Sequence, residues 1–375
     1  MSLDVLRGAT IAAMVLVNDP AMGPPYLYHQ LTHSPWNGWT FADTIFPTFL
    51  FMVGASMAPA MARYVEGRAP RRAALTRIIR RAGLLFLLGL LVNGFPLLLD
   101  GGHGLAAHLR VPGVLQRIAI AYLLASLAVL YLRPRYQALL AGALLGGYWA
   151  ALSWVSVPGY GAGVLSPQGN LAAWVDRAVF GSAHMYGGGV PGYDPEGLLG
   201  SVVAVAGVLA GYWAGRLLRS GRSRLVTTGL MVACATACVG AADLWASVLP
   251  VNKRMWTPSY VLLMTGLALG ALALAHLLFD QDHLVARITS LPLRVLGTNA
   301  LLVYIGSELT AAALGHYHHA LGDIANAPIP FFVWAHYLVP RFGPVAGALV
   351  YACAILGAWW LVLGGLFRRG LFLRI

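Results

Sequence analysis

Three polar side chains lie beside long apolar runs, where unpaired polar groups are costly. The stretch THSPWNGWTFADTIFPTFLFMVG carries His33 and Asp43, and Asn18 ends the apolar run before it. A histidine suits proton transfer, a carboxylate orients its ring, and an amide donates to a developing oxyanion. If the two apolar runs form a helical hairpin, these three side chains converge at its mouth. His33, Asn18 and Asp43 are therefore candidates for catalysis.

The same stretch also fits a simpler interpretation. Trp36 and Trp39 flank Asn37, and tryptophan is enriched where a spanning helix meets the membrane surface. In that case His33 lies in an interfacial loop and does no chemistry. Residue spacing alone leaves both interpretations open.

The composition indicates which class of protein must position these groups. Of 375 residues, 59% are hydrophobic and only 10% are charged, against about 25% charged in a typical soluble domain. Too little polar surface remains for a water-facing fold, so we predict an integral membrane protein. The net charge of +12 does not require nucleic acid, because polytopic proteins collect arginine on cytoplasmic loops. Cys234, Cys238 and Cys353 lie in apolar runs and imply no disulfide framework.

The apolar segments predict an all-α, polytopic helical bundle. A spanning helix needs roughly 20 mainly apolar residues. We predict about ten, near residues 5–20, 41–64, 78–99, 113–132, 136–157, 198–217, 225–248, 257–279, 292–313 and 343–366.

Arginine predicts the orientation of this bundle. The positive-inside tendency places the arginine-rich loops, and with them both termini, in the cytoplasm. These loops hold Arg68, Arg71, Arg72, Arg77, Arg80, Arg81, Arg133, Arg135, Arg216, Arg219, Arg222, Arg224, Arg287, Arg294, Arg368, Arg369 and Arg374.

Two charged residues fall within the predicted membrane region. Arg117 lies about two turns past Arg110 and needs a partner or an anionic ligand; Asp43 and Glu308 are the partners we expect. Glu308 lies on an otherwise apolar helix, where interhelical hydrogen bonding is the simpler interpretation. Asp4 and Arg7 lie one turn apart and are expected to pair.

The segment RAPRRAALTRIIRR, residues 68–81, has two interpretations. It anchors the protein at anionic lipid headgroups, or it holds the phosphates of a nucleotide-like cofactor, since arginine forks match phosphate oxygens. A Gly-rich phosphate loop of the Walker or Rossmann type is absent from the sequence, so an ATP-driven pump or a membrane dehydrogenase is unsupported. We expect no metal, because the histidine-rich HYHH lacks the carboxylate or cysteine spacing of a metal site.

A series of motifs resembles one known family. SLDVLRGATIAAMVLVN and HSPWNGWTFADTIFPTFLFMVG, followed in order by RVPGVLQRIAIAYL, NLAAWVDR, YDPEGLLG, NKRMWTPSYVL and LGTNALLVYIGSE, resemble the heparan-α-glucosaminide N-acetyltransferase family, including its bacterial membrane relatives. The resemblance covers nearly the whole chain. It implies a single transmembrane acyltransferase domain over residues 1–375, which takes acetyl from cytosolic acetyl-CoA and delivers it to a glucosamine-type amine on the far side of the membrane. It also implies a bacterial inner-membrane location and suggests a homodimer.

The resemblance assigns roles residue by residue. His33 matches the family's active-site histidine and serves as acetyl carrier or general base, while Asn18 matches the asparagine that closes the first helix and polarises the thioester carbonyl. Asp43 orients His33 or pairs with Arg117. Asp19 and Pro20 depart from the residues that relatives often show there, which leaves the acceptor open.

The same resemblance predicts two sets of binding residues. The phosphates of acetyl-CoA are expected to remain at the arginine-rich face, and the amino sugar is expected on the opposite face. The phosphate-side set is Arg77, Arg80, Arg81 and Arg117, and the acceptor set is Trp36, Asn37, Asp194, Glu196, Trp256 and Glu308. The main alternative is a transporter of amino sugars or cell-envelope glycan fragments, for which the buried charges would line a substrate pathway.

Overall fold

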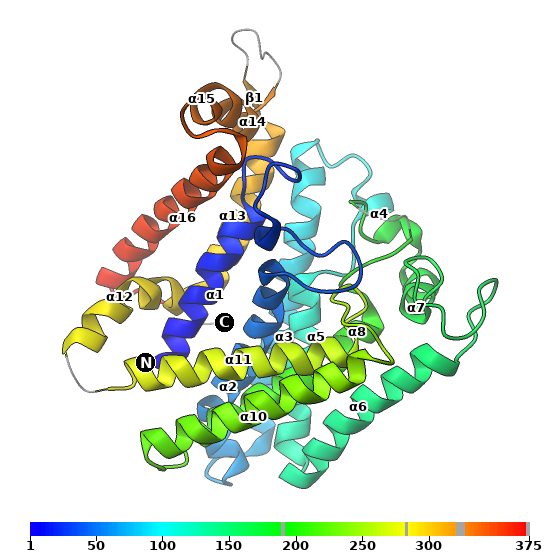
Figure 1. Cartoon of the computed structure of the whole chain (residues 1–375), viewed down its shortest axis with the longest axis vertical. Coiled ribbons are helices and arrows are strands. Elements are labelled where there is room, and N and C mark those ends of the chain that lie inside the picture. The colour runs from blue at the N-terminus through cyan, green and yellow to red at the C-terminus, as the bar shows by residue number, and fades with distance from the viewer. Residues whose placement is uncertain (189–191, 282–283, 320–326, 373–375) are drawn as a thin grey trace.

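The computed structural model describes residues 1–188, 192–281, 284–319 and 327–372 of the chain (Figure 1). These residues are predominantly helical, as predicted, with the addition of one short strand pair. The helical elements are α1 (Ser2–Asn18), η1 (His29–Leu31), α2 (Phe41–Val65), α3 (Arg71–Leu99), α4 (Leu105–His108), α5 (Val114–Tyr131), α6 (Pro134–Trp154), α7 (Leu171–Phe180), η2 (Ser182–His184), α8 (Leu198–Val203), α9 (Val205–Leu218), α10 (Arg224–Ala246), α11 (Pro258–Phe279), α12 (Leu284–Thr298), α13 (Ala300–His316), α14 (Ile329–Val333), η3 (Trp334–Leu338), α15 (Val339–Phe342) and α16 (Pro344–Arg368). Strands β1 (His318–His319) and β2 (Ala327–Pro328) pair antiparallel.

Many of these helices can cross a membrane. Within the described residues, seven spans are long and apolar enough, and the bent pair α12–α13 makes an eighth if it is one span. The seven are α2, α3, α5, α8 with α9, α10, α11 and α16. The chain is therefore a multi-pass membrane protein of mainly helical structure. Arg374, used above to orient the chain, lies outside the described residues.

The arginine-rich segment differs from the prediction. It was expected as a loop before a helix beginning at residue 78, but α3 already begins at Arg71. Pro70 precedes the helix in an extended conformation, as is usual just before a helix start. With 29 residues, α3 is about 43 Å long, longer than the ~30 Å hydrocarbon core. Its arginine-bearing turns therefore extend beyond the membrane interior as ordered helix.

The predicted single helix over residues 292–313 is wrong, because the chain bends there. α12 ends at Thr298 and α13 begins at Ala300, with an angle of 64° between their axes. Thr298 turns its hydroxyl onto the Val295 carbonyl, and the Asn299 amide donates to the Leu371 carbonyl. At this break the Thr298 hydroxyl competes for a backbone carbonyl of its own helix, and the Asn299 amide bonds to a segment distant in sequence.

Close helix contacts in the bundle depend on glycine. A Cβ atom on Gly54 of α2 would lie 1.9 Å from the Val208 carbonyl oxygen of α9, and one on Gly211 would lie 1.9 Å from that of Phe51. α1 and α12 approach as closely at Gly8 and Gly297. Small residues let membrane helices approach this closely, so van der Waals contact and carbonyl dipoles can hold them together. Figure 1 shows α1 among α2, α12, α13 and α16, with α10 and α11 side by side.

α1 connects two chemically different ends of the protein. Arg7 lies near its first turn and Asn18 at its last, about 16 Å apart along the helix axis. Arg7 pairs with Asp4 at 3.2 Å, as predicted, and also donates to Ser56 of α2 and to the carbonyl of Gly297 at the α12–α13 break. The arginine end of α1 is thereby fixed to two other helices, α2 and α12.

Candidate active site

The loop that carries His33 is fastened to the loop before α11. The backbone N–H of Gly38 donates to the Val251 carbonyl at 2.8 Å, and the Asn252 side chain donates to Asn37 Oδ1 at 3.0 Å. Gly38 has a φ of 91°, a left-handed conformation that glycine adopts without steric cost. The His33 loop and the loop before α11, more than 200 residues apart in sequence, are therefore hydrogen-bonded to each other.

Asp43 lies in the first turn of α2, and both oxygens of its carboxylate are engaged. Oδ2 accepts the backbone N–H groups of Ser34 and Thr40 at 3.0 Å each, and with Thr40 it forms a capping box. Oδ1 lies 2.8 Å from His33 Nδ1. An ionised carboxylate can only accept, so Nδ1 carries the proton and Nε2 presents a lone pair. The predicted convergence of His33 and Asp43 is confirmed, and the geometry is that of an imidazole oriented by an ionised carboxylate.

Lys253 completes this group, and the sequence interpretation missed it. Its ammonium lies 3.3 Å from Asp43 Oδ1, 3.0 Å from His33 Nδ1 and 3.4 Å from Nε2. Burial lowers the pKa of Lys253, while the charges of Asp43 and Glu196 act in the opposite direction. The motif NKRMW held the available signal, since this lysine lies in a loop with few other cations. Its contact with His33 could not be read from a separation of 220 residues.

The turn that presents Lys253 is held by Trp256, a non-glycine residue at a φ of 57°. Such a conformation costs about 1–2 kcal/mol and persists where its surroundings fix it. Trp256 packs edge-on against Phe46 and Tyr260, and the Arg117 guanidinium lies 4.4 Å from its ring centroid. The ring is only 2% exposed, so the expected sugar-facing position of Trp256 is wrong; it packs inside the protein.

The predicted pairing of Arg117 with Asp43 or Glu308 is also wrong. Arg117 is 1% exposed and donates to the backbone carbonyls of Pro195 and Gly197 at 2.9 and 3.4 Å. Carbonyl oxygens carry no formal charge, so a search for opposite charges in the sequence could not find them. These hydrogen bonds hold the segment between α7 and α8 in place. The predicted role of Arg117 in binding a phosphate is therefore not supported.

A second arginine holds the acidic residues of that segment. Arg110 forms a bidentate ion pair with Asp194 at 2.7–2.9 Å and a further bond to Glu196 at 2.5 Å. Asp194 also accepts two backbone N–H groups and is buried, so its expected contact with an acceptor is not available in this structure. Burial disfavours the Glu196 carboxylate, but Arg110 and Arg117 outweigh burial and hold the pKa of Glu196 below its usual range.

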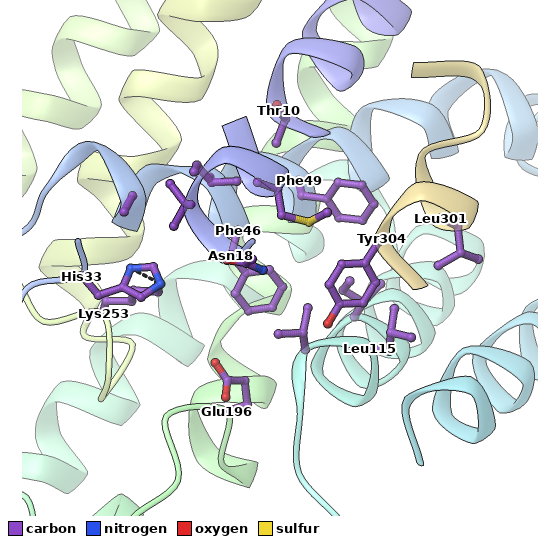
Figure 2. A pocket seen from close by; sticks show the side chains of 16 residues that line it. Thr10, Asn18, His33, Phe46, Phe49, Leu115, Glu196, Lys253, Leu301 and Tyr304 are labelled. Carbon is purple, nitrogen blue, oxygen red and sulfur yellow. Dashed lines mark hydrogen bonds between the residues drawn. The ribbon is translucent and has the colours of Figure 1, made fainter. Parts of the chain in front are cut away.

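Glu196 and His33 line one cavity, which we call the His33 cavity (Figure 2). Its volume is about 150 Å³, and most of its wall is apolar. Figure 2 shows His33 and Lys253 together at one end, Tyr304 and Leu301 towards the other, and Asn18 between them. The lining residues are Thr10, Met14, Val17, Asn18, His33, Ala42, Ile45, Phe46, Phe49, Val114, Leu115, Ile118, Glu196, Lys253, Leu301 and Tyr304.

Asn18 reaches this cavity from the end of α1, so the predicted convergence with His33 is confirmed. One N–H of its amide donates to Glu308 Oε1 at 3.0 Å. Glu308 thereby orients Asn18, and the second N–H of the amide is left for another acceptor. Of the other acceptor candidates, Trp36 donates its indole N–H to the Leu165 carbonyl, and Asn37 accepts from Asn252.

Two further cavities share lining residues with their neighbours in the direction of the arginine-bearing turns of α3. A second cavity of about 250 Å³, the Arg7 cavity, shares Phe49 and Leu301 with the first and is lined by Arg7, Ser56 and Arg81. Arg81 in turn lines a third cavity of about 380 Å³, the Arg80 cavity.

Three of the four predicted phosphate-side arginines gather at this third cavity. Arg77, Arg80 and Arg81 line it from one face of α3, as their i, i+3 and i+4 spacing allows. Arg81 lies 4.8 Å over the Tyr122 ring, and its Nε has no hydrogen-bond partner among the described residues. A buried donor without a partner fits an anionic ligand. Elsewhere in the described chain, no three His, Cys, Asp or Glu side chains are grouped as metal ligands.

Comparison with known proteins shows what the sequence is similar to. Residues 1–168 match the family model described as heparan-alpha-glucosaminide N-acetyltransferase, catalytic. The human protein heparan-alpha-glucosaminide N-acetyltransferase is 28% identical over 363 residues, which cover 82% of this chain and 52% of the human protein. The mouse protein of the same name is 27% identical over 360 residues, 82% of this chain and 53% of the mouse protein. The chain thus spans about half the length of these relatives. On these matches, the chain is similar to the heparan-alpha-glucosaminide N-acetyltransferase family over residues 1–168 and to two proteins of that name over most of its length.

Proposed function

We propose that this chain is a transmembrane N-acetyltransferase, which moves acetyl from acetyl-CoA at its arginine-rich face to the amine of an amino sugar at its His33 face. The observation that carries the proposal is the row of three cavities sharing lining residues, with the His33 group at one end and Arg77, Arg80 and Arg81 at the other. The charged phosphates of CoA cannot enter hydrocarbon, whereas its thin pantetheine arm can pass between helices.

The donor end is built for an anion. Arginine forks bind phosphate oxygens with two N–H groups each. Arg80 and Arg81 contact these phosphates in our proposal, with Arg77 beside them. Phe49 and Leu301, which line both the His33 cavity and the Arg7 cavity, contact the pantetheine arm in this proposal.

The acetyl end supplies a base and an oxyanion donor. Asn18 polarises the thioester carbonyl with its free N–H. His33 Nε2, with its lone pair fixed by Asp43, acts in one of two ways. It attacks the carbonyl carbon, so that an N–C bond forms, the C–S bond breaks and the thiolate leaves. Otherwise it takes a proton from the acceptor ammonium, and the freed amine attacks the same carbon directly.

Trapping distinguishes these two routes. Protein incubated with radiolabelled acetyl-CoA and no acceptor retains label on His33 if the acetyl-imidazole forms. Kinetics that require both substrates to bind before thiol is released favour the direct route.

The test of the function itself is thiol release. Purified protein in detergent is expected to release thiol from acetyl-CoA when glucosamine is added, and His33→Ala is expected to abolish the release. Asp243→Asn on α10 is the matched control, because Asp243 is exposed and lines none of the described cavities. Glucosamine uptake into sealed vesicles without an acyl donor, with no thiol release in detergent, would instead support a transporter.

The membrane arrangement belongs to the same proposal. Residues 1–375 form one transmembrane domain, in which α1 and α6 add two spans to the seven and the bent pair, giving ten. Both termini and the arginine-rich ends lie in the cytoplasm, and the membrane is a bacterial inner membrane.

Cysteine labelling tests this sidedness. In a background with the native cysteines replaced, a membrane-impermeant maleimide is expected to label Ala162→Cys in intact cells. It is expected to label Ser220→Cys only after permeabilisation. Both positions are exposed loop residues on opposite predicted faces. The reverse labelling pattern would overturn the orientation.

A further inference from the structure

Asp19 is the least compensated acidic residue of the described chain, and the chemistry above does not use it. It is 5% exposed, and neither carboxylate oxygen has a hydrogen-bond partner among the described residues. The Ser307 hydroxyl lies near enough to act in the direction of lowering the pKa of Asp19, but it donates its hydrogen bond to the Tyr304 carbonyl. No ion pair to Asp19 is found in the described part of the chain, although a buried charge usually requires one.

Two further effects make the Asp19 carboxylate unfavourable. It caps the carboxyl end of α1, where the helix dipole is negative and an anion is disfavoured. The Glu308 carboxylate on α13 lies near enough to repel it, and together with burial this raises the pKa of Asp19 to about 7. Tyr351 of α16 is the other titratable group that faces Asp19. A single bound cation would relieve burial, dipole and repulsion at once.

Asp19 lines a separate cavity, and its carboxylate oxygens are buried at the wall of that cavity. This Asp19 cavity, of about 390 Å³, lies between the end of α1, the outer part of α13 and the segments α14 and α16. Its volume falls in the usual range of small-molecule sites, about 300–1,000 Å³. Phe331 and Tyr351 contribute aromatic rings to its wall. Apart from Asp19 the wall is largely apolar, so the carboxylate is its one strong recognition feature among the described lining residues.

Asn18 joins this cavity to the site of chemistry. It lines both the Asp19 cavity and the His33 cavity. A group bound at Asp19 thus lies next to Asn18, whose amide is proposed to contact the thioester carbonyl. Glu196, the acidic residue of the His33 cavity itself, is already neutralised by Arg110.

We propose that the Asp19 cavity is the acceptor subsite, in which the Asp19 carboxylate binds the primary ammonium of the incoming amino sugar. The inference rests on the proposed function and deepens it. The ammonium offers three N–H donors to the unpartnered oxygens, and the aromatic side chains stack on the sugar ring. The acceptor therefore enters on the α13–α16 side of Asn18, away from the Lys253 side of His33.

A binding experiment without donor tests the subsite. The thermal unfolding midpoint of the purified full chain in detergent is measured near pH 7 with glucosamine or with glucose at equal ionic strength. Glucosamine is expected to raise the midpoint of the wild type and glucose to leave it unchanged. Asp19→Asn is expected to weaken glucosamine binding about tenfold or more, since a charge-assisted bond is roughly twice as strong as a neutral one. Asp243→Asn, which also removes one negative charge, is expected to behave as the wild type.

Equilibrium dialysis of radiolabelled glucosamine supplies a second measurement on the wild type alone. Methylammonium is expected to compete and glucose is not. Equal midpoint shifts in the wild type and Asp19→Asn, or no preference for glucosamine over glucose, would overturn the proposal.

Steady-state kinetics test the proposed Asp19 subsite separately from the proposed acetyltransferase activity. In the thiol-release assay, Asp19→Asn is expected to raise the glucosamine KM about tenfold and to leave the acetyl-CoA KM unchanged. Thiol release with an unaltered glucosamine KM would reject the subsite and retain the acetyltransferase. Binding that depends on Asp19 without any thiol release would retain the subsite and reject the acetyltransferase.

Discussion

At the scale of single residues, Asp43 shows how one carboxylate combines folding and chemistry. It caps the first turn of α2, ties Ser34 into the His33 loop and faces His33 Nδ1. A change that keeps its shape but removes its charge therefore separates these roles.

We expect Asp43→Asn to fold and to lose most of its transferase rate. The amide retains an oxygen for the capping bonds, but it no longer fixes the proton on Nδ1. Loss of general-base function is worth roughly 10²–10⁴ in rate. The measurement is steady-state thiol release, with the acetyl-CoA KM expected to stay unchanged and Asp243→Asn as the control. A rate within about twofold of the wild type would contradict the assigned role.

Asp19 leads to a prediction about stability and pH. Its pKa is raised to about 7 in the folded protein, against an ordinary value of 3.8. Between these values the folded state holds a proton that the unfolded state has released, so stability falls as pH rises through this window. Three pKa units correspond to ~4 kcal/mol at most. Thermal unfolding in detergent is expected to show this loss in the wild type between about pH 4 and pH 7.

Asp19→Asn has no proton to lose at this position, so its stability is expected to change less over the same range. At about pH 8 it is expected to unfold at a higher temperature than the wild type. Parallel pH profiles for the two proteins would contradict an uncompensated Asp19.

Sequence reasoning found some of these residues and missed others for a physical reason. His33, Asn18 and Asp43 lie within 26 positions of one another, so a helical hairpin necessarily brings them close. Lys253 lies in a loop that is distant in sequence. Backbone and side-chain amide hydrogen bonds hold that loop against the His33 loop, and no side-chain pattern in the sequence reveals them. Arg117 donates to backbone carbonyls. Because every residue has a backbone carbonyl, the sequence does not indicate which ones bind Arg117.

At the scale of helices, hydropathy predicted the positions of the membrane-spanning helices better than their bends. Apolar runs of about 20 residues locate spans because hydrocarbon requires them. The mean hydropathy of such a run does not reveal the break at Thr298 and Asn299, because two residues hardly alter the mean. The break bears on the proposed donor path, because Gly297 and Thr298 line the Arg7 cavity.

Close packing of α2 on α9 gives a prediction at this scale. Gly211→Ala places a methyl group 1.9 Å from the Phe51 carbonyl oxygen, so the helices must separate. Overpacking of this kind costs typically about 1–3 kcal/mol. Gly207→Ala, on the same helix, meets nothing within 4 Å and is the matched control. Thermal unfolding is expected to show a lower midpoint for Gly211→Ala alone; equal midpoints would argue against a tight α2–α9 contact.

At the scale of the whole molecule, the chain is polarised along α1. Arg7, Arg77, Arg80 and Arg81 face cavities at one end, and Asn18 and His33 face cavities at the other. The sequence predicted this polarity through the distribution of arginine. It could not predict that the cavities share lining residues, because that depends on how side chains from α1, α2, α3 and α13 meet.

This polarity makes the two substrates separable by mutation. Arg81→Gln removes a cation from the donor end, and a charge-assisted hydrogen bond contributes about 1.5–3 kcal/mol. We expect the acetyl-CoA KM to rise roughly tenfold or more and the glucosamine KM to stay unchanged, the opposite of Asp19→Asn. Arg222→Gln is the control, since Arg222 is an exposed arginine of the same predicted face that lines none of the described cavities.

A truncated donor sharpens the Arg81 experiment. A short acetyl thioester without phosphates cannot contact Arg81, so wild type and Arg81→Gln are expected to use it equally poorly. The preference of the wild type for acetyl-CoA over this thioester is then expected to shrink in the variant by the same factor as the KM rises. If Arg81→Gln weakens both donors alike, Arg81 supports the helices around the cavity and does not bind phosphate.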